Sequence, residues 1–304
     1  MKILLFGRGG QVGWELQRSL AVLGQVVALD FDAAANPARL CGDFSNLAGL
    51  AETVRSVAPD VIVNAAAHTA VDRAEAEPDL VRTLNALAPG VLATEARKLG
   101  AWLVHYSTDY VFAGSGTKPW LEDDVTGPLS VYGRTKLEGE QLVAACPQHL
   151  ILRTSWVYAA RGGNFAKTML RLATERDQMT VISDQIGAPT SAELLADVTA
   201  HAIRAAIAAP QLAGLYHCVA SGETSWHAYA CYVLEQALQL GWVLKAGPAQ
   251  VASIATADYP TAAHRPLNSR LDTRKLQAAF ALHLPHWQVH VRRMLEEISA
   301  PTQP

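Results

Sequence analysis

The sequence of 304 residues has few cysteines, no long apolar run and little net charge, and each absence excludes a class of protein. The four cysteines are widely scattered and form no CxxC pair, which argues against a zinc site or a redox dithiol. No apolar run approaches membrane-spanning length, and the N-terminus lacks the apolar region of a signal peptide. A net charge of -3 offers nucleic acids and anionic membranes no general attraction. We therefore expect a cytoplasmic protein with neither nucleic acid nor membrane as a partner.

Short apolar runs alternate with amphipathic stretches through the first half of the chain. The runs are continuous, which is typical of parallel strands that helices cover on both faces. Strands are predicted at 2–6, 26–29, 60–67, 101–107 and 150–158, and helices at 11–23, 46–58, 79–99 and 130–145. This alternation predicts an α/β fold of the Rossmann type, with a doubly wound parallel sheet.

The regularity weakens after residue 158. Helices are predicted at 164–175, 191–208, 225–240 and 286–299, a short strand at 214–220, and an ordered loop at 252–270. We expect an NAD(P)-binding Rossmann domain over residues 1–158 and a smaller, mainly substrate-binding C-terminal lobe over 159–304. Some later elements are expected to return to the sheet.

A glycine-rich loop follows the first predicted strand and opens the first helix. Gly7, Gly10 and Gly13 permit a tight turn and a close approach of the backbone to a pyrophosphate, which helix N–H groups then meet. The pattern alone also fits a plain strand–helix turn, but Asp30 ends the second strand, where an acid typically accepts from ribose hydroxyls. Arg8 would suit a 2′-phosphate or be a solvated charge. The loop therefore predicts a dinucleotide site for NADH or NADPH.

The stretch "GDFSN" brings Asp43 and Phe44 after the second strand. The two residues could face an adenine from this loop. They could equally cap the helix that begins near Ser45 or Asn46, and the residues alone leave both readings open.

A hydroxyl and a Tyr/Lys pair follow in the middle of the chain. Tyr132 and Lys136 are four residues apart, so a helix places both on one face, where the ammonium lowers the pKa of the phenol. Such a pair is usually only a solvated helical pair. Ser107 and Thr108 end a predicted strand, at the edge of the sheet where ligands bind, although a hydroxyl there can also cap local backbone. The order along the chain predicts a catalytic site that protonates a carbonyl: first the glycine loop, then Thr108 at a strand end, then Tyr132 and Lys136 on a helix.

Several longer stretches carry a resemblance over nearly the whole chain: "ILLFGRGGQVGWELQ" (3–17), "DVIVNAAAHTAVDRAE" (60–75), "VHYSTDYVF" (104–112), "VYGRTKLEGE" (131–140), "SDQIGAPT" (183–190) and "RPLNSRLDT" (265–273). With these the chain resembles the extended short-chain dehydrogenase/reductase family and, within it, the dTDP-4-dehydrorhamnose reductases. The resemblance implies NAD(P)H-dependent reduction of the C4 ketone of dTDP-4-dehydro-6-deoxy-L-mannose to dTDP-L-rhamnose. It also implies that Tyr132 gives the proton, Lys136 keeps the tyrosine pKa low and Thr108 bonds the carbonyl.

The resemblance further implies the binding residues. The implied cofactor contacts are Gly7, Gly10, Gln11, Val12, Gly13, Asp30, Asp43, Phe44, Ala65, Ala66, Ala67, Thr69, Tyr106, Tyr132 and Lys136. The implied substrate contacts are Thr108, Asp109, Tyr132, Trp156, Asn164 and Arg265, the last facing the diphosphate of a dTDP-sugar; from the residues alone, Trp156 could be a core aromatic and Arg265 a surface ion pair. Glu15, Glu193 and Glu297 match positions where some of these reductases hold Mg²⁺ at a homodimer contact, although on their own they read as surface glutamates.

One departure from related enzymes bears on the reaction. Nucleotide-sugar dehydratases of this fold usually carry Asp-Glu after the strand-end Thr, whereas Asp109 is here followed by Tyr110. We therefore expect a site that reduces a ketone and is poorly suited to dehydration. Two alternatives remain: a non-catalytic NADP-binding subunit, like the beta subunit of methionine adenosyltransferase, and an epimerase or reductase of another nucleotide sugar.

Overall fold

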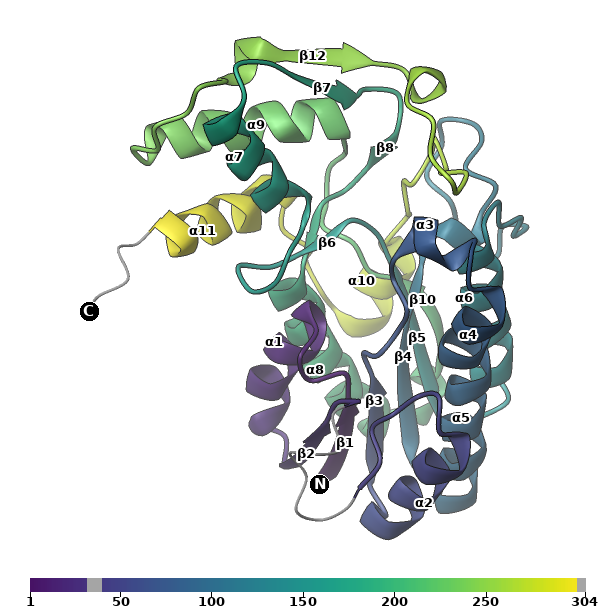
Figure 1. The fold of residues 1–304 in the computed structure, drawn as a ribbon. Coiled ribbons are helices and arrows are strands. Elements are labelled where there is room, and N and C mark those ends of the chain that lie inside the picture. Colours follow the sequence, from purple (N-terminus) through teal and green to yellow (C-terminus); the bar gives the residue numbers. More distant parts are fainter. Residues whose placement is uncertain (32–39, 300–304) are drawn as a thin grey trace.

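A six-stranded parallel sheet forms the centre of the protein (Figure 1). The computed structural model describes residues 1–31 and 40–299. The strand order is β10-β5-β4-β3-β1-β2. The bounds are β1 Lys2–Phe6, β2 Gln25–Leu29, β3 Val61–Asn64, β4 Trp102–Thr108, β5 His149–Thr154 and β10 Gly214–His217. The predicted Rossmann-type, doubly wound α/β fold is confirmed.

Helices cover both faces of the sheet because successive strand residues point to opposite sides. Ile3 and Leu5 pack toward α1 (Gln11–Ala21) and α8 (Ala192–Ala208), whereas Leu4 and Phe6 pack on the other side. That second face is covered by α2 (Leu47–Val57), α5 (Ala88–Leu99) and α6 (Val131–Val143). Each such side chain contributes about 1.5–3 kcal/mol on burial, so the two apolar layers fix the position of the strand ends.

The helical run from residue 78 to 99, predicted as one helix, contains a widened turn. It consists of α4 (Pro78–Arg82), a π-helical segment η2 (Thr83–Leu87) and α5. Asn85 lies in the π segment, and its amide accepts from the backbone N–H of His68 at 2.8 Å and donates to the carbonyl of His68 at 3.1 Å. The irregular turn therefore ties this helix to the loop after β3, which leads to α3 (Val71–Ala74).

A second lobe stands at the carboxyl ends of the strands, at the top of Figure 1. It contains α7 (Phe165–Glu175), α9 (Trp226–Gln239) and α11 (Trp287–Ser299), together with β7 (Met179–Ile182) paired in parallel with β12 (Val251–Ile254). The predicted loop at 252–270 was therefore wrong for residues 252–254, which belong to β12. Shorter pairings join β6 (Val157–Tyr158) to β9 (Thr190–Ser191) and β8 (Ile186–Gly187) to β11 (Thr224–Ser225), and α10 (Arg274–Phe280) precedes α11.

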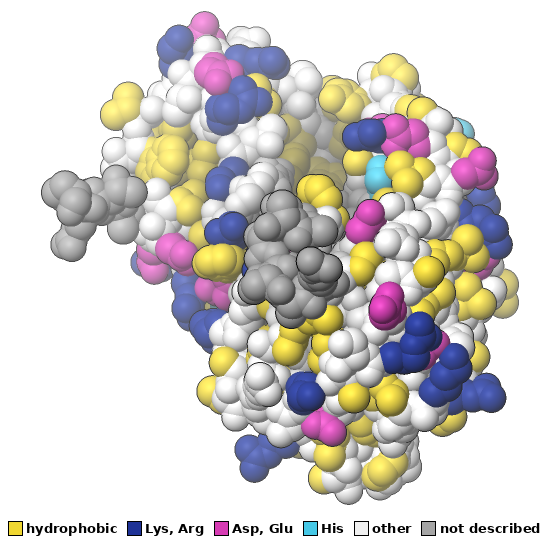
Figure 2. Space-filling model, turned by 60° about the horizontal axis from the view of Figure 1, so that its bottom comes forward, with side chains coloured by type: hydrophobic (Ala, Val, Ile, Leu, Met, Phe, Trp, Pro, Cys, Tyr) yellow, Lys and Arg dark blue, Asp and Glu magenta, His cyan; other side chains and the backbone are white. Residues whose placement is uncertain are grey.

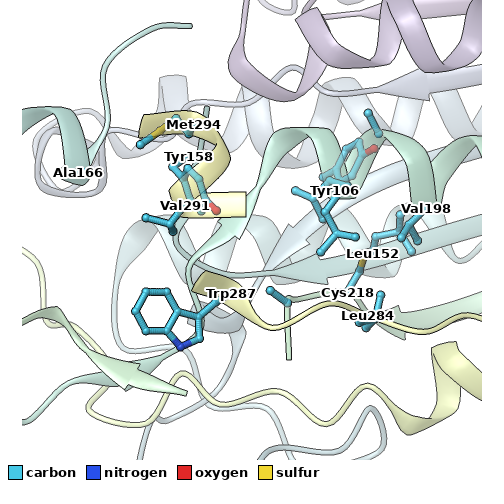
Figure 3. Close-up of a cluster of buried hydrophobic side chains, with 14 of the residues drawn as sticks. Tyr106, Leu152, Tyr158, Ala166, Val198, Cys218, Leu284, Trp287, Val291 and Met294 are labelled. Carbon is cyan, nitrogen blue, oxygen red and sulfur yellow. The ribbon is translucent and has the colours of Figure 1, made fainter. Parts of the chain in front are cut away.

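The lobe and the sheet share one apolar core. Figure 3 shows Tyr158 beside Val291 and Trp287 of α11, in the same cluster as Tyr106 and Leu152 of the sheet. The sixth strand, β10, and the helix α8 both come from beyond residue 158 and belong to the sheet layers. The division of the chain at residue 158 remains a prediction.

The surface carries charges of both signs. On the face shown in Figure 2, Lys and Arg side chains lie scattered among Asp and Glu. Among residues 1–31 and 40–299, no helix combines the length and the hydropathy needed to span a membrane.

Candidate active site

The glycine-rich loop between β1 and α1 is shaped by backbone contacts that exclude side chains. Gly7 has φ +82°, and a Cβ placed on it would lie 2.7 Å from the backbone nitrogen of Ala66. Gly10 is the N-cap of α1 and donates its N–H to the carbonyl of Gly7 at 3.1 Å. Glycine therefore lets the loop pass close to the backbone after β3, and α1 begins at this loop, where helix N–H groups can meet a pyrophosphate.

The two acids predicted for the adenosine end both brace backbone turns. Asp30 accepts from the N–H of Gly9 at 2.8 Å, which holds the glycine loop against the end of β2. Asp43 accepts from the N–H and the hydroxyl of Ser45, while Asn46 caps α2. Both acids also line a cavity. The stretch "GDFSN" therefore both caps α2 and borders the cavity, so its two interpretations are compatible.

Two adjoining cavities extend from the glycine loop along the strand ends. The first, of about 410 Å³, is lined by residues that include Gly7, Asp30, Phe44 and Ala66. The second, of about 490 Å³, contains the predicted catalytic residues. The cavities share Gly10, Ala65 and Ala67, so together they form one elongated cleft that suits a dinucleotide in its first part and a second ligand in its far part. Gln11, Val12, Thr69 and Tyr106 also line the second cavity.

Thr108 and Asp109 stand where β4 passes into the 3₁₀ turn η3 (Asp109–Val111). The hydroxyl of Thr108 accepts from the N–H of Tyr110 at 3.2 Å and donates to Oδ1 of Asp109 at 3.0 Å. Burial raises the pKa of Asp109 to about 6, and bonds from Ser269 and Thr108 offset only part of this effect. A ligand carbonyl must therefore compete with Asp109 for the proton of Thr108.

Tyr132 and Lys136 lie on α6 and face the same cavity, as their spacing predicts. Ser130 caps this helix by accepting from Gly133 N–H at 3.1 Å. The ring of Tyr132 packs edge-on against Tyr110, with ring centroids 5.5 Å apart. The ammonium nitrogen of Lys136 lies 2.6 Å from the carbonyl oxygen of Tyr106, to which it donates. The structure thus brings Thr108, Tyr132 and Lys136 together in one cavity.

The prediction that Lys136 keeps the pKa of Tyr132 low is not met in this structure. Burial raises the pKa of Tyr132 to about 12, and the hydroxyl of Thr108 opposes that shift only in part. Burial also lowers the pKa of Lys136 to about 8, although Glu140 acts in the opposite direction. Enclosure in the cleft therefore shifts both groups toward their neutral forms.

An aromatic pair closes the far side of the cavity. Trp156 stacks on Trp226 with ring centroids 3.6 Å apart, and both line the cavity. Trp156 adopts φ +49°, and its ring lies against Gly187, where a Cβ would come within 2.8 Å of it. Gln185 accepts from the indole N–H of Trp226 at 3.1 Å. Trp226 was missed from the sequence, where it is only the second residue of the helix predicted at 225–240.

Two residues predicted to contact the substrate hold other partners. Asn164 caps α7 and donates to the side-chain oxygen of Gln11 at 3.2 Å; it does not line the cavity. Arg265 pairs with Asp72 of α3, with a shortest nitrogen–oxygen distance of 2.6 Å. The surface ion-pair reading of Arg265 therefore describes this structure.

The three glutamates predicted to hold magnesium are close enough to interact by charge. The pKa of Glu193 is raised by burial and by the charges of Glu15 and Glu297. However, Glu15 pairs with Arg18 and Glu193 with Arg293. In the part of the chain that the structure describes, no group of three His, Cys, Asp or Glu side chains is arranged to hold a metal ion. The described chain does not support the predicted magnesium site.

Comparison with known proteins gives a consistent result. A family model described as the RmlD substrate binding domain matches residues 1–300. A dTDP-4-dehydrorhamnose reductase of Escherichia coli (strain K12) is 58% identical, and the match covers 99% of each chain. The structure of a dTDP-4-dehydrorhamnose reductase of Bacillus anthracis str. Ames, in complex with NADP, has a TM-score of 0.86 at 32% identity and covers 97% of this chain and 99% of its own.

A more distant structure shows the fold alone. The UDP-glucose 4-epimerase of Thermus thermophilus has a TM-score of 0.78 at 19% identity, covering 99% of this chain and 100% of its own. At that identity, a shared sheet and cleft carry no information on the reaction. The full-length matches at higher identity do, and the chain belongs to the dTDP-4-dehydrorhamnose reductase family.

Proposed function

We propose that this protein reduces the C4 ketone of dTDP-4-dehydro-6-deoxy-L-mannose to dTDP-L-rhamnose, the last step of dTDP-rhamnose biosynthesis, with NADPH or NADH. The observation that carries the proposal is the meeting of Thr108, Tyr132 and Lys136 in one cavity that continues into the glycine-loop cleft. The names of the relatives support the substrate, and the NADP complex of one relative supports the cofactor class.

The residues of the cleft fit a dinucleotide. The cradle at Gly7 and the N-terminus of α1 would take the pyrophosphate, and Asp30, Asp43 and Phe44 would border the adenosine. When bound, the reduced nicotinamide supplies the hydride that reduces C4.

Tyr132 is the proposed proton donor. A pKa of about 12 keeps the phenol protonated at neutral pH, which is the form that a reduction requires. Lys136, one turn away, would stabilise the phenolate as it forms whenever the lysine is charged. Thr108 would bond the ketone oxygen once its proton turns away from Asp109.

The far part of the cavity is the proposed sugar site. Asp109, Trp156 and Trp226 line it, and we expect Trp226 to share the packing of Trp156 against the sugar. Arg265 would meet the diphosphate by exchanging its bond to Asp72 for one to a phosphate oxygen. The homodimer remains a prediction that only the resemblance carries.

The test is turnover of a panel of dTDP- and UDP-4-keto sugars, followed by the oxidation of NADPH and NADH. We expect oxidation with the dTDP-4-keto-6-deoxy-L-sugar and a product with the mobility of dTDP-L-rhamnose. Preference for a different sugar would favour the alternative reductase, and cofactor binding without oxidation on any sugar would favour the regulatory subunit.

The proton donor is tested by Tyr132→Phe, which should lower turnover about 10²–10⁴-fold with little change in cofactor affinity. Tyr232→Phe is the matched control, because its hydroxyl bonds the carbonyl of Gln288 in the lobe, away from the cavity. Full turnover by Tyr132→Phe would refute the assigned role.

A further inference from the structure

A row of three buried side chains, Asn64, His105 and Lys136, lies behind the catalytic tyrosine. Asn64 ends β3 and is the register partner of His105 in β4, and α6 carries Lys136 across β4. All three are at most 2% exposed. The function proposed above uses Lys136 but assigns nothing to the other two.

The orientation of the Asn64 amide is set by the backbone. Its Oδ1 accepts from the N–H of Ala66 at 3.0 Å, so its Nδ2 is the atom that faces Nδ1 of His105, also at 3.0 Å. An amide nitrogen only donates, and therefore Nδ1 must be the acceptor. Burial holds the pKa of His105 well below its ordinary value, so the ring is neutral and its single proton sits on Nε2.

That proton points at the catalytic lysine. Nε2 of His105 lies 3.3 Å from Nζ of Lys136. An ammonium has three N–H groups and no lone pair, so a charged Lys136 would set donor against donor. A neutral amine accepts the Nε2 proton with its lone pair and still donates to the carbonyl of Tyr106. The contact is thus fully satisfied only by the neutral lysine.

The other tautomer of His105, with the proton on Nδ1, also leaves two donors facing each other. A proton on Nδ1 would free Nε2 to accept from an ammonium, but it would set Nδ1–H against the Nδ2 group of Asn64. Turning the amide would then leave the N–H of Ala66 facing an NH₂ group. In each arrangement a charged Lys136 leaves two buried donors opposed, which is costly for polar groups enclosed by protein.

We propose that Asn64 and His105 are positioning residues that favour the neutral amine of Lys136 and so set its proton affinity for the reduction. This inference rests on the proposed function, in which Lys136 serves Tyr132. After Tyr132 gives its proton to the alkoxide, a charged Lys136 can return one proton to the phenolate and become the neutral amine that His105 accommodates. The ammonium is then restored by one proton from solvent.

Charged groups near Lys136 do not replace this effect. Glu140, one turn further along α6, raises the pKa of Lys136, but it is held in a bidentate pair with Arg153 of β5 at 2.7 and 2.9 Å. Asp109 of η3 acts on Tyr132. Two other charged side chains beside α6 are engaged elsewhere: Glu75 accepts from the N–H of Val131, and Arg82 pairs with Glu138.

The test measures the protonation of Lys136 directly. Protein labelled with ¹³C at lysine Cε is titrated by NMR, and the Lys136 signal is assigned from its loss in Lys136→Met. In His105→Gln the side-chain oxygen can accept from an ammonium, so the pKa of Lys136 should rise by about one to two pH units. His201→Gln is the control, because that imidazole bonds the carbonyl of Phe280 and should leave Lys136 unchanged.

A second variant and a tautomer measurement complete the test. Asn64→Asp offers an acceptor to Nδ1, draws the ring proton there, and should also raise the pKa of Lys136. In the unmodified protein, ¹⁵N shifts of His105 should show the proton on Nε2; a proton on Nδ1 would overturn the proposal whether or not the variants fold. An unchanged Lys136 pKa in two folded variants would overturn it as well. No substrate is used, so failure of the proposed function stays distinguishable.

Discussion

Replacement of Asp109 by asparagine is expected to make the protein more stable and less active above pH 6. The side chain is 2% exposed, and burial raises the pKa of its carboxyl to about 6. Oδ1 accepts from Thr108 at 3.0 Å, and this bond and the Ser269 hydroxyl offset only part of the cost of burying the charge. At neutral pH the fold therefore holds a poorly solvated negative charge beside the catalytic hydroxyl.

The sign of the effect follows from the two pKa values. Below about pH 4 the carboxyl is protonated in the folded and the unfolded chain, and burial of a charge costs nothing. Between about pH 4 and pH 6 the unfolded chain loses this proton while the folded chain keeps it, so the free energy of unfolding falls as the pH rises. A difference of about two pH units corresponds to about 3 kcal/mol, reached above pH 6.

Asparagine has nearly the same shape, keeps an oxygen for the Thr108 proton and carries no charge. We expect urea unfolding to show Asp109→Asn more stable than the unmodified protein by up to about 3 kcal/mol at pH 8 and by much less at pH 4.5. Asp258→Asn, at an exposed position, should show no such trend. Turnover should fall, because the proposed sugar site loses its carboxylate. An equal loss of stability at both pH values would refute the reasoning.

Two further substitutions test the frame of the cleft. Gly7→Ala should weaken NADPH binding at least tenfold and lower the stability by about 1–2 kcal/mol or more, because the new Cβ would collide with the backbone of Ala66. Gly100→Ala is the control: Gly100 also has a positive φ, +67°, but a Cβ there meets open space, so the variant should lose stability without losing NADPH binding. Arg153→Met should lower the free energy of unfolding by about 3–5 kcal/mol by leaving Glu140 buried and unpaired, and adding Glu140→Leu should recover most of that loss; additive losses would contradict the ion-pair argument.

Most of the sheet was predictable from the sequence because its inner strands are buried on both faces. The runs "KILLF" and "WLVHYST" each begin with or contain a continuous apolar stretch, and they form β1 and β4. The small sheet of the lobe was not predictable. Its strands "MTVI" and "VASI" are four residues long and partly exposed, and they pair across about seventy residues of chain. Nothing local in either strand identifies the other.

The catalytic members of the site were predictable, but Trp226 and the chemical state of the site were not. Strand-end and helical spacing placed Thr108, Tyr132 and Lys136 in one cavity. Spacing along α6 could not show that Lys136 bonds the carbonyl of Tyr106 and faces His105, because those contacts depend on how the helix crosses β4. For the same reason, the sequence predicted a lowered pKa for Tyr132, where burial in the assembled cleft raises it.

Burial also bears on which reaction the cleft can perform. It raises the pKa of Tyr132 and of Tyr110, and it lowers that of Lys136, so the two phenols are protonated at neutral pH. A dehydration needs a base as well as an acid, and Tyr110 stands at the position of the second carboxylate. A protonated phenol with a raised pKa is a poor base but a competent donor. Asp109, the one carboxylate among the described residues that line this part of the cavity, already accepts from Thr108. A site built this way gives a proton to an alkoxide more readily than it removes one from carbon, which is the requirement for ketone reduction.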